Sequence, residues 1–290
     1  MKNISKFCLL LFSATHFGQD FYGKVEYQTI QNKSKKEAVS ISKESEKDAA
    51  EDAIAGIDKE AFEEAMKKAF QKNYLLTFNK NEALFEEVVA LEKPKPGQGG
   101  VSFSVSVSMS GDGDKYMNTK DKISYTEEDI FGDEFVIKDS LPKIAWEISN
   151  ETKIIGDYNC VKATYTEPVS KNDLEAYERY QEKTKNGKSS LFEMKKPEPK
   201  TITAWYTSEI PVSFGPNGVW GLPGLILQLE NENYIYFCTK VTIKNNETVK
   251  VKIPNAGKVI SKKEYEKYEK KMQKQMEDNG GTIMFRETKN

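Results

Sequence analysis

A short segment rich in turn-forming residues, Gly215 to Gly224, constrains the fold of this chain more than any other feature. Gly and Pro occur there as Gly215-Pro216 and again as Gly221-Leu222-Pro223-Gly224. Apolar residues alternate directly after it, from Leu225 to Glu230. The Pro223-Gly224 pair suits a type II turn, because Pro presets φ at the second position and Gly accepts a positive φ at the third. The pattern therefore predicts a rigid corner that leads into a strand.

Period-two alternation of apolar and polar residues recurs along the chain and predicts a series of strands. The strand-like runs are Asp20 to Gln31, Asn73 to Val89, Val101 to Ser108, Phe135 to Ile148, Tyr158 to Tyr165, Thr201 to Tyr206, Leu225 to Glu230, Tyr234 to Ile243, Thr248 to Ile253 and a short last one at Thr282 to Arg286. Phe135 to Ile148 and Tyr158 to Tyr165 together are expected to supply two or three strands. Because short turns separate many of them, we expect a mainly antiparallel sheet.

Helical patterns occur in three separate places. An apolar stripe of Phe62, Met66 and Phe70 predicts an amphipathic helix, and a second helix is expected near residues 174–183. Ser261 and Glu264 form a capping box that opens a third helix, to about residue 277. Helices that do not alternate with strands favour an α+β fold: a curved antiparallel sheet, of half-barrel form as one alternative, with a few peripheral helices.

The N-terminus has the pattern of a secretory signal peptide. Lys2 and Lys6 precede a short apolar run, Phe7 to Phe12, and small residues follow it. The sequence thus predicts a signal peptide over 1–19 and one mature domain over 20–290, with charged helical insertions at about 33–72 and 167–200. No later run approaches the ~20 apolar residues of a spanning helix, so no transmembrane anchor is expected in the mature chain. We expect a periplasmic or secreted protein.

Composition excludes several classes of function. The single histidine, His16, lies in the expected signal peptide, so the mature chain has no imidazole for a nucleophile pair or a zinc site. Lys and Arg number 43 against 45 Asp and Glu, a balance that does not favour nucleic acid as a partner. Neither a catalytic motif, nor a cofactor motif, nor a metal-binding motif stands out. Cys160 and Cys238 remain after cleavage, and they are either a disulfide or two buried thiols.

Several short sequence motifs occur in the same order as in one bacterial family. They are the run from Val136 to Pro142 with Trp146, Gly156 to Cys160 with Lys162-Ala163, Ala204 to Thr207, Ile210 to Pro216, and Gly221 to Ile226. This series resembles the GLPGLI family of exported proteins from Gram-negative bacteria, over roughly residues 23–253. The family has no established activity, so the resemblance implies export and a shared domain but no catalytic residues. Asp157 departs from it, since the family more often has a second glycine there.

The turn-rich segment has two readings, a rigid corner of the core or a binding edge lined by glycines and aromatic rings. The candidate binding residues are Trp205, Tyr206, Pro216, Trp220, Gly221, Pro223 and Gly224. On this basis the leading hypothesis is a non-catalytic extracytoplasmic binding or interaction protein, whose partner is an envelope protein, a peptide or a lipid. A lipid or peptide carrier of half-barrel type is one alternative, and it requires an apolar concave face.

A hydrolase built on carboxylates is a further alternative. Its candidate residues are Asp139, Glu147, Glu209 and Glu230, which lie in or near the family words. An acid and base pair of this kind needs two carboxylates that face each other at ~5–9 Å across a cleft.

Overall fold

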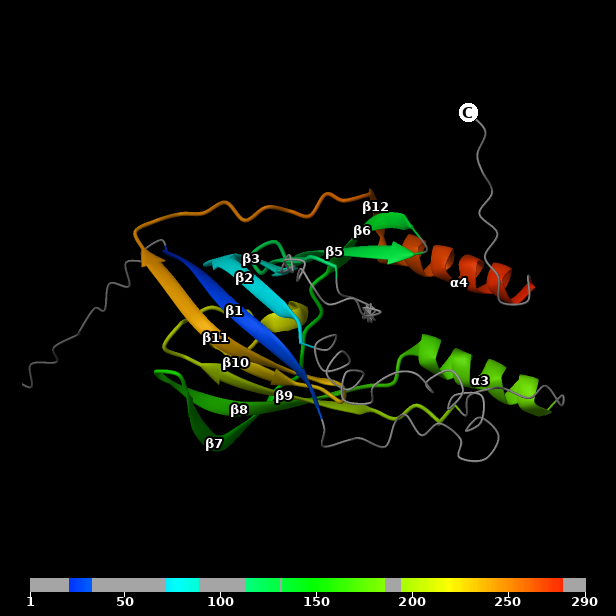
Figure 1. The fold of residues 1–290 in the computed structure, drawn as a ribbon, viewed down its shortest axis with the longest axis horizontal. Helices are drawn as coiled ribbons and strands as arrows, with labels where there is room; N and C mark the ends of the chain where they lie inside the picture. Colours follow the sequence, from blue (N-terminus) through cyan, green and yellow to red (C-terminus); the bar gives the residue numbers. More distant parts are fainter. Residues whose placement is uncertain (1–20, 33–70, 89–112, 131, 186–193, 279–290) are drawn as a thin grey trace, which may run out of the picture.

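The computed structural model describes residues 21–32, 71–88, 113–130, 132–185 and 194–278. They form twelve strands, two α-helices and one short 3₁₀ turn (Figure 1). The strands are β1 (Phe21–Gln31), β2 (Asn73–Asn79), β3 (Glu82–Glu87), β4 (Lys115–Asn118), β5 (Ile123–Ile130), β6 (Asp133–Ser140), β7 (Glu147–Ile155), β8 (Tyr158–Glu167), β9 (Lys200–Thr207), β10 (Leu225–Glu230), β11 (Tyr234–Asn245) and β12 (Lys258–Ser261). The helices are α3 (Lys171–Lys185) and α4 (Lys262–Asp278), and the 3₁₀ turn is η2 (Pro216–Gly218).

All twelve strands belong to one sheet, in the order β12-β6-β5-β4-β3-β2-β1-β11-β10-β9-β8-β7. Every neighbouring pair is antiparallel except β12 and β6, which run parallel. The two end strands, β12 and β7, are at opposite ends of this order, so the sheet is open. The expectation of a mainly antiparallel sheet is confirmed, and the helices are few.

The sheet curves strongly around the connection between β9 and β10. Strands β4 and β9 are six positions apart in the sheet order, which corresponds to about 29 Å in a flat sheet. Yet η2, within the β9–β10 connection, touches β3, β4 and β10. The ring of Phe214 in this connection also lies 6.5 Å from that of Phe78 on β2. The sheet therefore folds over the connection, which fills its concave face.

The core lies on this concave face. Period-two alternation puts Val25 and Tyr27 of β1 and Leu76 and Phe78 of β2 on one side, and all four are buried. Phe214 is 0% exposed. The Tyr27 hydroxyl donates a 2.5 Å hydrogen bond to the carbonyl oxygen of Ile226 on β10, so this core residue of β1 also binds the second strand along, beyond β11.

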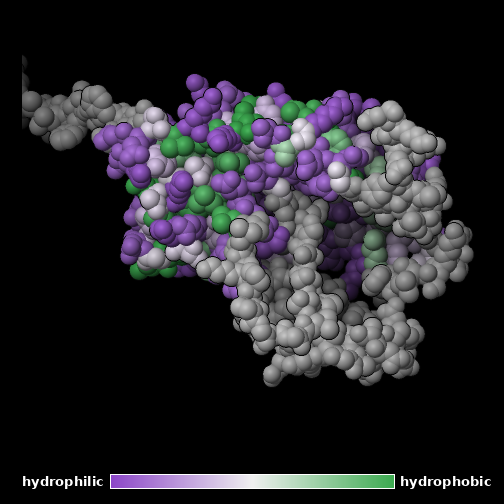
Figure 2. Space-filling model, turned by 45° about the horizontal axis from the view of Figure 1, so that its top comes forward, coloured by the Kyte–Doolittle hydropathy of each residue, from purple (hydrophilic) through white to green (hydrophobic). Residues whose placement is uncertain are grey.

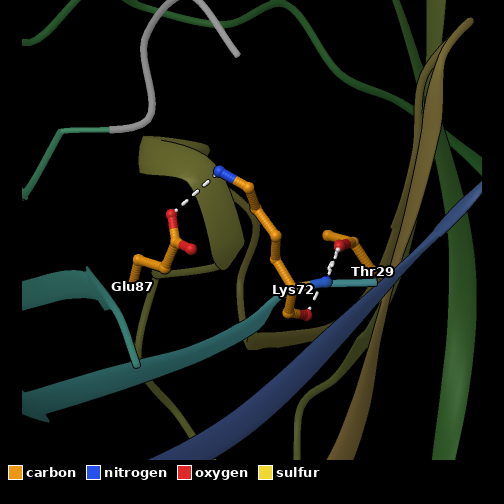
Figure 3. A network of polar contacts seen from close by, with 3 residues as sticks. All are labelled: Thr29, Lys72 and Glu87. Carbon is orange, nitrogen blue, oxygen red and sulfur yellow. Dashed lines mark hydrogen bonds and ion pairs between the residues drawn. The ribbon is translucent and has the colours of Figure 1, made fainter. Parts of the chain in front are cut away.

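A polar clasp joins β1, β2 and β3 at the end of the sheet where residue 72 enters β2 (Figure 3). The Thr29 side chain is fully buried, and its hydroxyl accepts the backbone N–H of Lys72 at 3.0 Å. The Thr29 backbone N–H donates to the Lys72 carbonyl oxygen at 2.9 Å, and the Lys72 ammonium pairs with Glu87 of β3 at 3.0 Å. The Thr29 hydroxyl thus extends the β1–β2 ladder by one residue.

The two helices lie side by side beyond one end of the sheet (Figure 1). Phe135 of β6 packs its ring 4.9 Å from Tyr268 and 6.0 Å from Tyr265 of α4. Lys270 of α4 forms a 3.0 Å ion pair with Glu175 of α3. Both helices are therefore peripheral, as the sequence predicts.

The two free strand edges differ. β12 has four residues, whereas β7 is nine residues long and exposes Ile148 and Ile154. The pairing of β7 with β8 is interrupted between Ile148 and Thr152; the charged residue Glu151 lies within this irregularity and Lys153 follows it. Bulges and charges on an edge strand oppose pairing with another chain.

Most sequence-based boundaries agree with the structure, and two expectations need correction. The capping box at Ser261 and Glu264 is present, with the Ser261 hydroxyl donating to Glu264 at 2.7 Å at the start of α4. The run from Thr248 to Ile253, predicted as a strand, pairs with no strand of the described residues and crosses the end of the sheet between β11 and β12 (Figure 1). A side-chain bond from Asn79 to the Val249 carbonyl oxygen holds it there instead of a ladder.

The second correction concerns β4, β5 and β12, which the sequence reading does not predict. The predicted signal peptide, the helix at 58–70 and the runs at 101–108 and 282–286 lie outside the described residues.

Candidate functional site

A cavity of about 310 Å³ lies where the curved sheet faces the β9–β10 connection. Its lining comes from β4, β5, β8, β9, the segment 141–146 and the β9–β10 connection. The lining residues are Lys115, Tyr116, Met117, Ser124, Thr126, Leu141, Pro142, Ile144, Trp146, Tyr165, Glu167, Ile202, Asn217, Gly218, Val219 and Trp220. The cavity therefore depends on the curvature of the whole sheet.

Aromatic rings form much of the lining. The Trp146 indole N–H donates a 3.0 Å hydrogen bond to the carbonyl oxygen of Trp220, and the Trp146 ring lies 6.0 Å from that of Tyr165 on β8. The indole nitrogen of Trp220 differs. It is buried and has no hydrogen-bond partner, the one such side-chain atom in the described part of the chain.

Polar groups of the lining come mainly from β4, β5 and β8. The Lys115 ammonium donates to the amide oxygen of Asn217 and so joins β4 to η2. Ser124 and Thr126 of β5 contribute hydroxyl groups, and Glu167 at the end of β8 contributes a carboxylate. The lining thus combines an apolar majority with a few hydrogen-bonding groups, as in many small-molecule sites.

A local backbone framework positions Trp220. Trp220 pairs with Phe214 in an isolated β-bridge, and the next residue, Gly221, donates its N–H to the Ser213 carbonyl oxygen at 3.0 Å. Gly221 has a φ of 99°, a left-handed value that favours glycine. Ile226 donates its N–H to the Phe214 carbonyl oxygen at 2.9 Å. These bonds hold the backbone on both sides of the indole.

The predicted type II turn at Pro223-Gly224 is not formed. Such a turn requires a positive φ at Gly224, and Gly224 is not among the residues with positive φ. Glycine is needed there for space, because a Cβ atom at this position would lie 2.1 Å from the carbonyl oxygen of Thr207. The segment does connect two strands, β9 and β10, and β9 packs closely against the entry to β10 at Gly224.

The candidate binding residues from the sequence separate into several environments. Trp220 lines the cavity, and Gly221 lies beside the Trp146 ring. Tyr206, Pro216 and Gly224 are buried, and Pro223 is exposed. The remaining residue, Trp205, alternates with Tyr206 along β9 and so faces the other side of the sheet.

On that outer side, Trp205 belongs to a separate cluster. The Lys153 ammonium lies 4.1 Å from the centre of the Trp205 ring and donates to Gln228 at 2.7 Å. Desolvation by burial lowers the pKa of Lys153. Because the ammonium covers the ring, this cluster packs as a cation–π contact of the sheet surface.

Sequence reasoning missed most of the cavity. Trp146 lies in a family word, but nothing local placed it beside Trp220. The hydroxyls of Ser124 and Thr126 lie in β5, which has a run of alternation from Ile123 to Glu127 that could have indicated the strand.

An acidic residue with a raised pKa, Asp114, directly precedes β4 in the chain. Burial raises the pKa of Asp114 to about 6, and the nearby carboxylates of Glu127 and Glu86 contribute further. Glu127 accepts the backbone N–H of Ala256 at 3.0 Å. Ionisation of Asp114 therefore opposes folding near neutral pH.

The two cysteines are free thiols in this structure, Cys160 buried and Cys238 partly buried. Burial raises the pKa of each thiol to about 11. Both are therefore almost fully protonated near neutral pH, which slows thiol exchange.

The four carboxylates proposed for a hydrolase lie on separate elements. Asp139 of β6 pairs with Lys262 at 3.3 Å. Glu209 accepts the backbone N–H of Asn159, Glu230 accepts the Gln228 amide, and Glu147 begins β7. None of the four lines the cavity, where Glu167 is the one carboxylate among the described lining residues.

Within the described ranges, no three His, Cys, Asp or Glu side chains lie together as a metal site, and neither helix is long and apolar enough to cross a membrane.

The face shown in Figure 2 has apolar residues in several patches among hydrophilic ones.

Comparison with known proteins gives a match to a family model over part of the chain. No curated protein matches the chain. Two structures of PNGF-II, in the C2 and P21 space groups, superpose with TM-scores of 0.43 and 0.42 at 14% and 16% identity. They cover 85% and 86% of this chain but only 32% and 33% of PNGF-II, so this chain spans about a third of that protein's length. A superposition of this quality carries no argument about activity. Residues 146–228, from Trp146 into β10, match the model of a family described as a protein of unknown function, Porph_ging.

Proposed function

We propose that this chain is an exported, non-catalytic binding protein that holds a small, largely apolar ligand in the cavity beside Trp220. The observation that carries the proposal is the combination of about 310 Å³ of space, an aromatic lining and a buried indole N–H without a partner. Ligand sites combine an apolar lining with a few polar groups that fix orientation. The resemblance to the exported GLPGLI family agrees with this reading.

The size of the cavity limits the ligand. Small-molecule sites range from about 300 to 1,000 Å³, and this cavity is at the lower end. The β9–β10 connection occupies the rest of the concave face, with Phe214 and Leu222 buried in it. This supports a compact ligand, or a single side chain of a longer one, over a whole lipid carried in a half-barrel.

The carboxylate-based hydrolase has less support. An acid and base pair needs two carboxylates across a cleft, and the lining of this cavity supplies Glu167 alone. Asp139 and Glu266 line a separate, more open hollow, and Asp139 is paired there with Lys262 at 3.3 Å.

Ligand recovery from cavity-filling variants tests the proposal. The purified protein is incubated with a small-molecule extract of a bacterial envelope and repurified, and the bound compounds are identified by mass spectrometry. Thr126→Phe fills the cavity from β5. Thr203→Phe is the matched control, because Thr203 alternates with Ala204 and faces the outer side of β9.

We expect the original protein and Thr203→Phe to retain the same compound, and Thr126→Phe to lose it. Retention by Thr126→Phe at the same level, or no retained compound in any form, would contradict the proposal.

Export is tested separately. Lys2, Lys6 and the apolar run to Phe12 support a cleaved signal. Expression in a Gram-negative host should give an extracytoplasmic product whose N-terminus is Gln19 or Asp20. A cytosolic product that still begins at Met1 would refute export.

A further inference from the structure

The unpartnered indole of Trp220 distinguishes it from Trp146, its neighbour in the cavity lining. The Trp146 N–H has an acceptor at 3.0 Å, whereas the Trp220 N–H has none and is buried by protein atoms. Buried polar atoms without a partner are uncommon in native structures, and each requires an explanation. An acceptor that arrives with a ligand explains this one.

Several bonds hold the main chain around Trp220, so a change on ligand binding would have to involve its side chain. The bridge to Phe214, the Gly221-to-Ser213 bond and the bond from Trp146 to the Trp220 carbonyl oxygen hold the main chain in place. The indole itself borders the cavity. Because protein atoms cover the N–H, its presentation to a ligand in the cavity requires a rotation about the side-chain torsions.

The charges of the lining select the acceptor. Glu167 and Lys115 carry opposite charges in the lining, and the Lys115 ammonium keeps its charge in the bond to the neutral Asn217 amide, so these two side chains give no net charge. A neutral carbonyl oxygen is then the acceptor that suits an uncharged indole donor. Leu141 and Ile202 add aliphatic surface beside the rings.

We propose that Trp220 turns its indole N–H into the cavity and binds a backbone carbonyl oxygen of a short peptide segment that places one apolar side chain among the aromatic rings. This proposal rests on the proposed function, because it names the ligand class of the same cavity.

The test uses N-acetyl-L-leucinamide as the probe and N-acetyl-L-leucine, its anionic counterpart, as the comparison. Indole N–H resonances of the full-length protein are followed by NMR during titration, and they are assigned with Trp→Phe variants. The Trp220 resonance should shift downfield and saturate with the amide, with weaker binding of the acid. Trp220→Phe keeps an aromatic ring but removes the donor, and it should weaken amide binding about tenfold.

Trp205→Phe is the matched control, because Trp205 lies on the outer face, and amide binding should not change in it. Equal binding of the amide by Trp220→Phe overturns this inference and leaves the proposed function intact. If the amide does not bind but an envelope compound is retained in the cavity, the peptide class is wrong. Failure of both probes and of compound retention overturns the inference and the proposed function together.

Discussion

Trp146→Phe and Trp220→Phe form a matched pair that tests how the cavity is built. Both tryptophans are half-buried in the same lining, and both variants exchange indole for phenyl. Trp146→Phe removes the donor of a 3.0 Å bond and leaves the Trp220 carbonyl oxygen unpaired. Trp220→Phe removes a buried donor that has no partner.

The two substitutions therefore change the hydrogen-bond contribution to the free energy of unfolding in opposite directions. Loss of this part-buried bond costs about 0.5–1.5 kcal/mol, whereas removal of the buried unpaired donor of Trp220 relieves a penalty of about 1–3 kcal/mol. The smaller ring costs packing energy in both variants, and this cost largely cancels in the difference. We expect Trp220→Phe to be more stable than Trp146→Phe by about 2 kcal/mol, which is about 4–8 °C in Tm for a chain of this size.

Urea unfolding gives the two free energies of unfolding, and equal m values show that the unfolding transition itself is unchanged. Calorimetry gives the two Tm values independently. If Trp220→Phe is as destabilised as Trp146→Phe, or more so, the indole of Trp220 has a partner in solution and the reasoning fails.

Three further predictions concern the frame of the site. The folded pKa of Asp114 is about 6, above its unfolded value, so the stability that this group contributes is full below pH 4 and falls as the pH rises through 6. Asp114→Asn should therefore raise the free energy of unfolding by about 1 kcal/mol at pH 7, after allowance for solvent screening, and leave it unchanged at pH 4. An equal effect at both pH values would contradict this cause. Thr29→Val removes the hydroxyl that accepts the Lys72 N–H and should cost about 1–3 kcal/mol in urea unfolding, whereas an unchanged midpoint would show that water replaces it. Gly224→Ala places a Cβ atom against the Thr207 carbonyl oxygen and should cost more than about 3 kcal/mol or abolish soluble expression, and a well-folded variant would refute this packing.

Much of the sheet could be predicted from the sequence, because half-buried antiparallel strands carry a period-two pattern. The runs at Phe21–Gln31 and Leu225–Glu230 show it clearly, and both form strands. The short strand Lys115–Asn118 has three buried residues in succession, so it carries no alternation. The run from Thr248 to Ile253 has the pattern of a strand but no neighbouring strand to pair with among the described residues.

The candidate site was less accessible to sequence reasoning. Trp220 could be proposed from the sequence, because it lies inside the turn-rich segment. Its neighbours Tyr165 and Thr126 are distant in the sequence and meet Trp220 only through the curvature of the sheet. That curvature results from the packing of Phe214 and its neighbours under many strands, which no local pattern reports. The opposite holds for Trp205. Its position near the turn-rich segment suggested a binding residue, but it faces the outer side of β9 and does not line the cavity.

Fluorine NMR of the full-length protein with 5-fluorotryptophan tests the central claim most directly. Each of Trp146, Trp205 and Trp220 gives a resonance that a Trp→Phe variant assigns. The retained envelope compound should shift the Trp146 and Trp220 resonances with one saturable affinity and leave Trp205 unchanged. A shift of Trp205 alone, or saturable binding that moves none of the three, would contradict a ligand site beside Trp220.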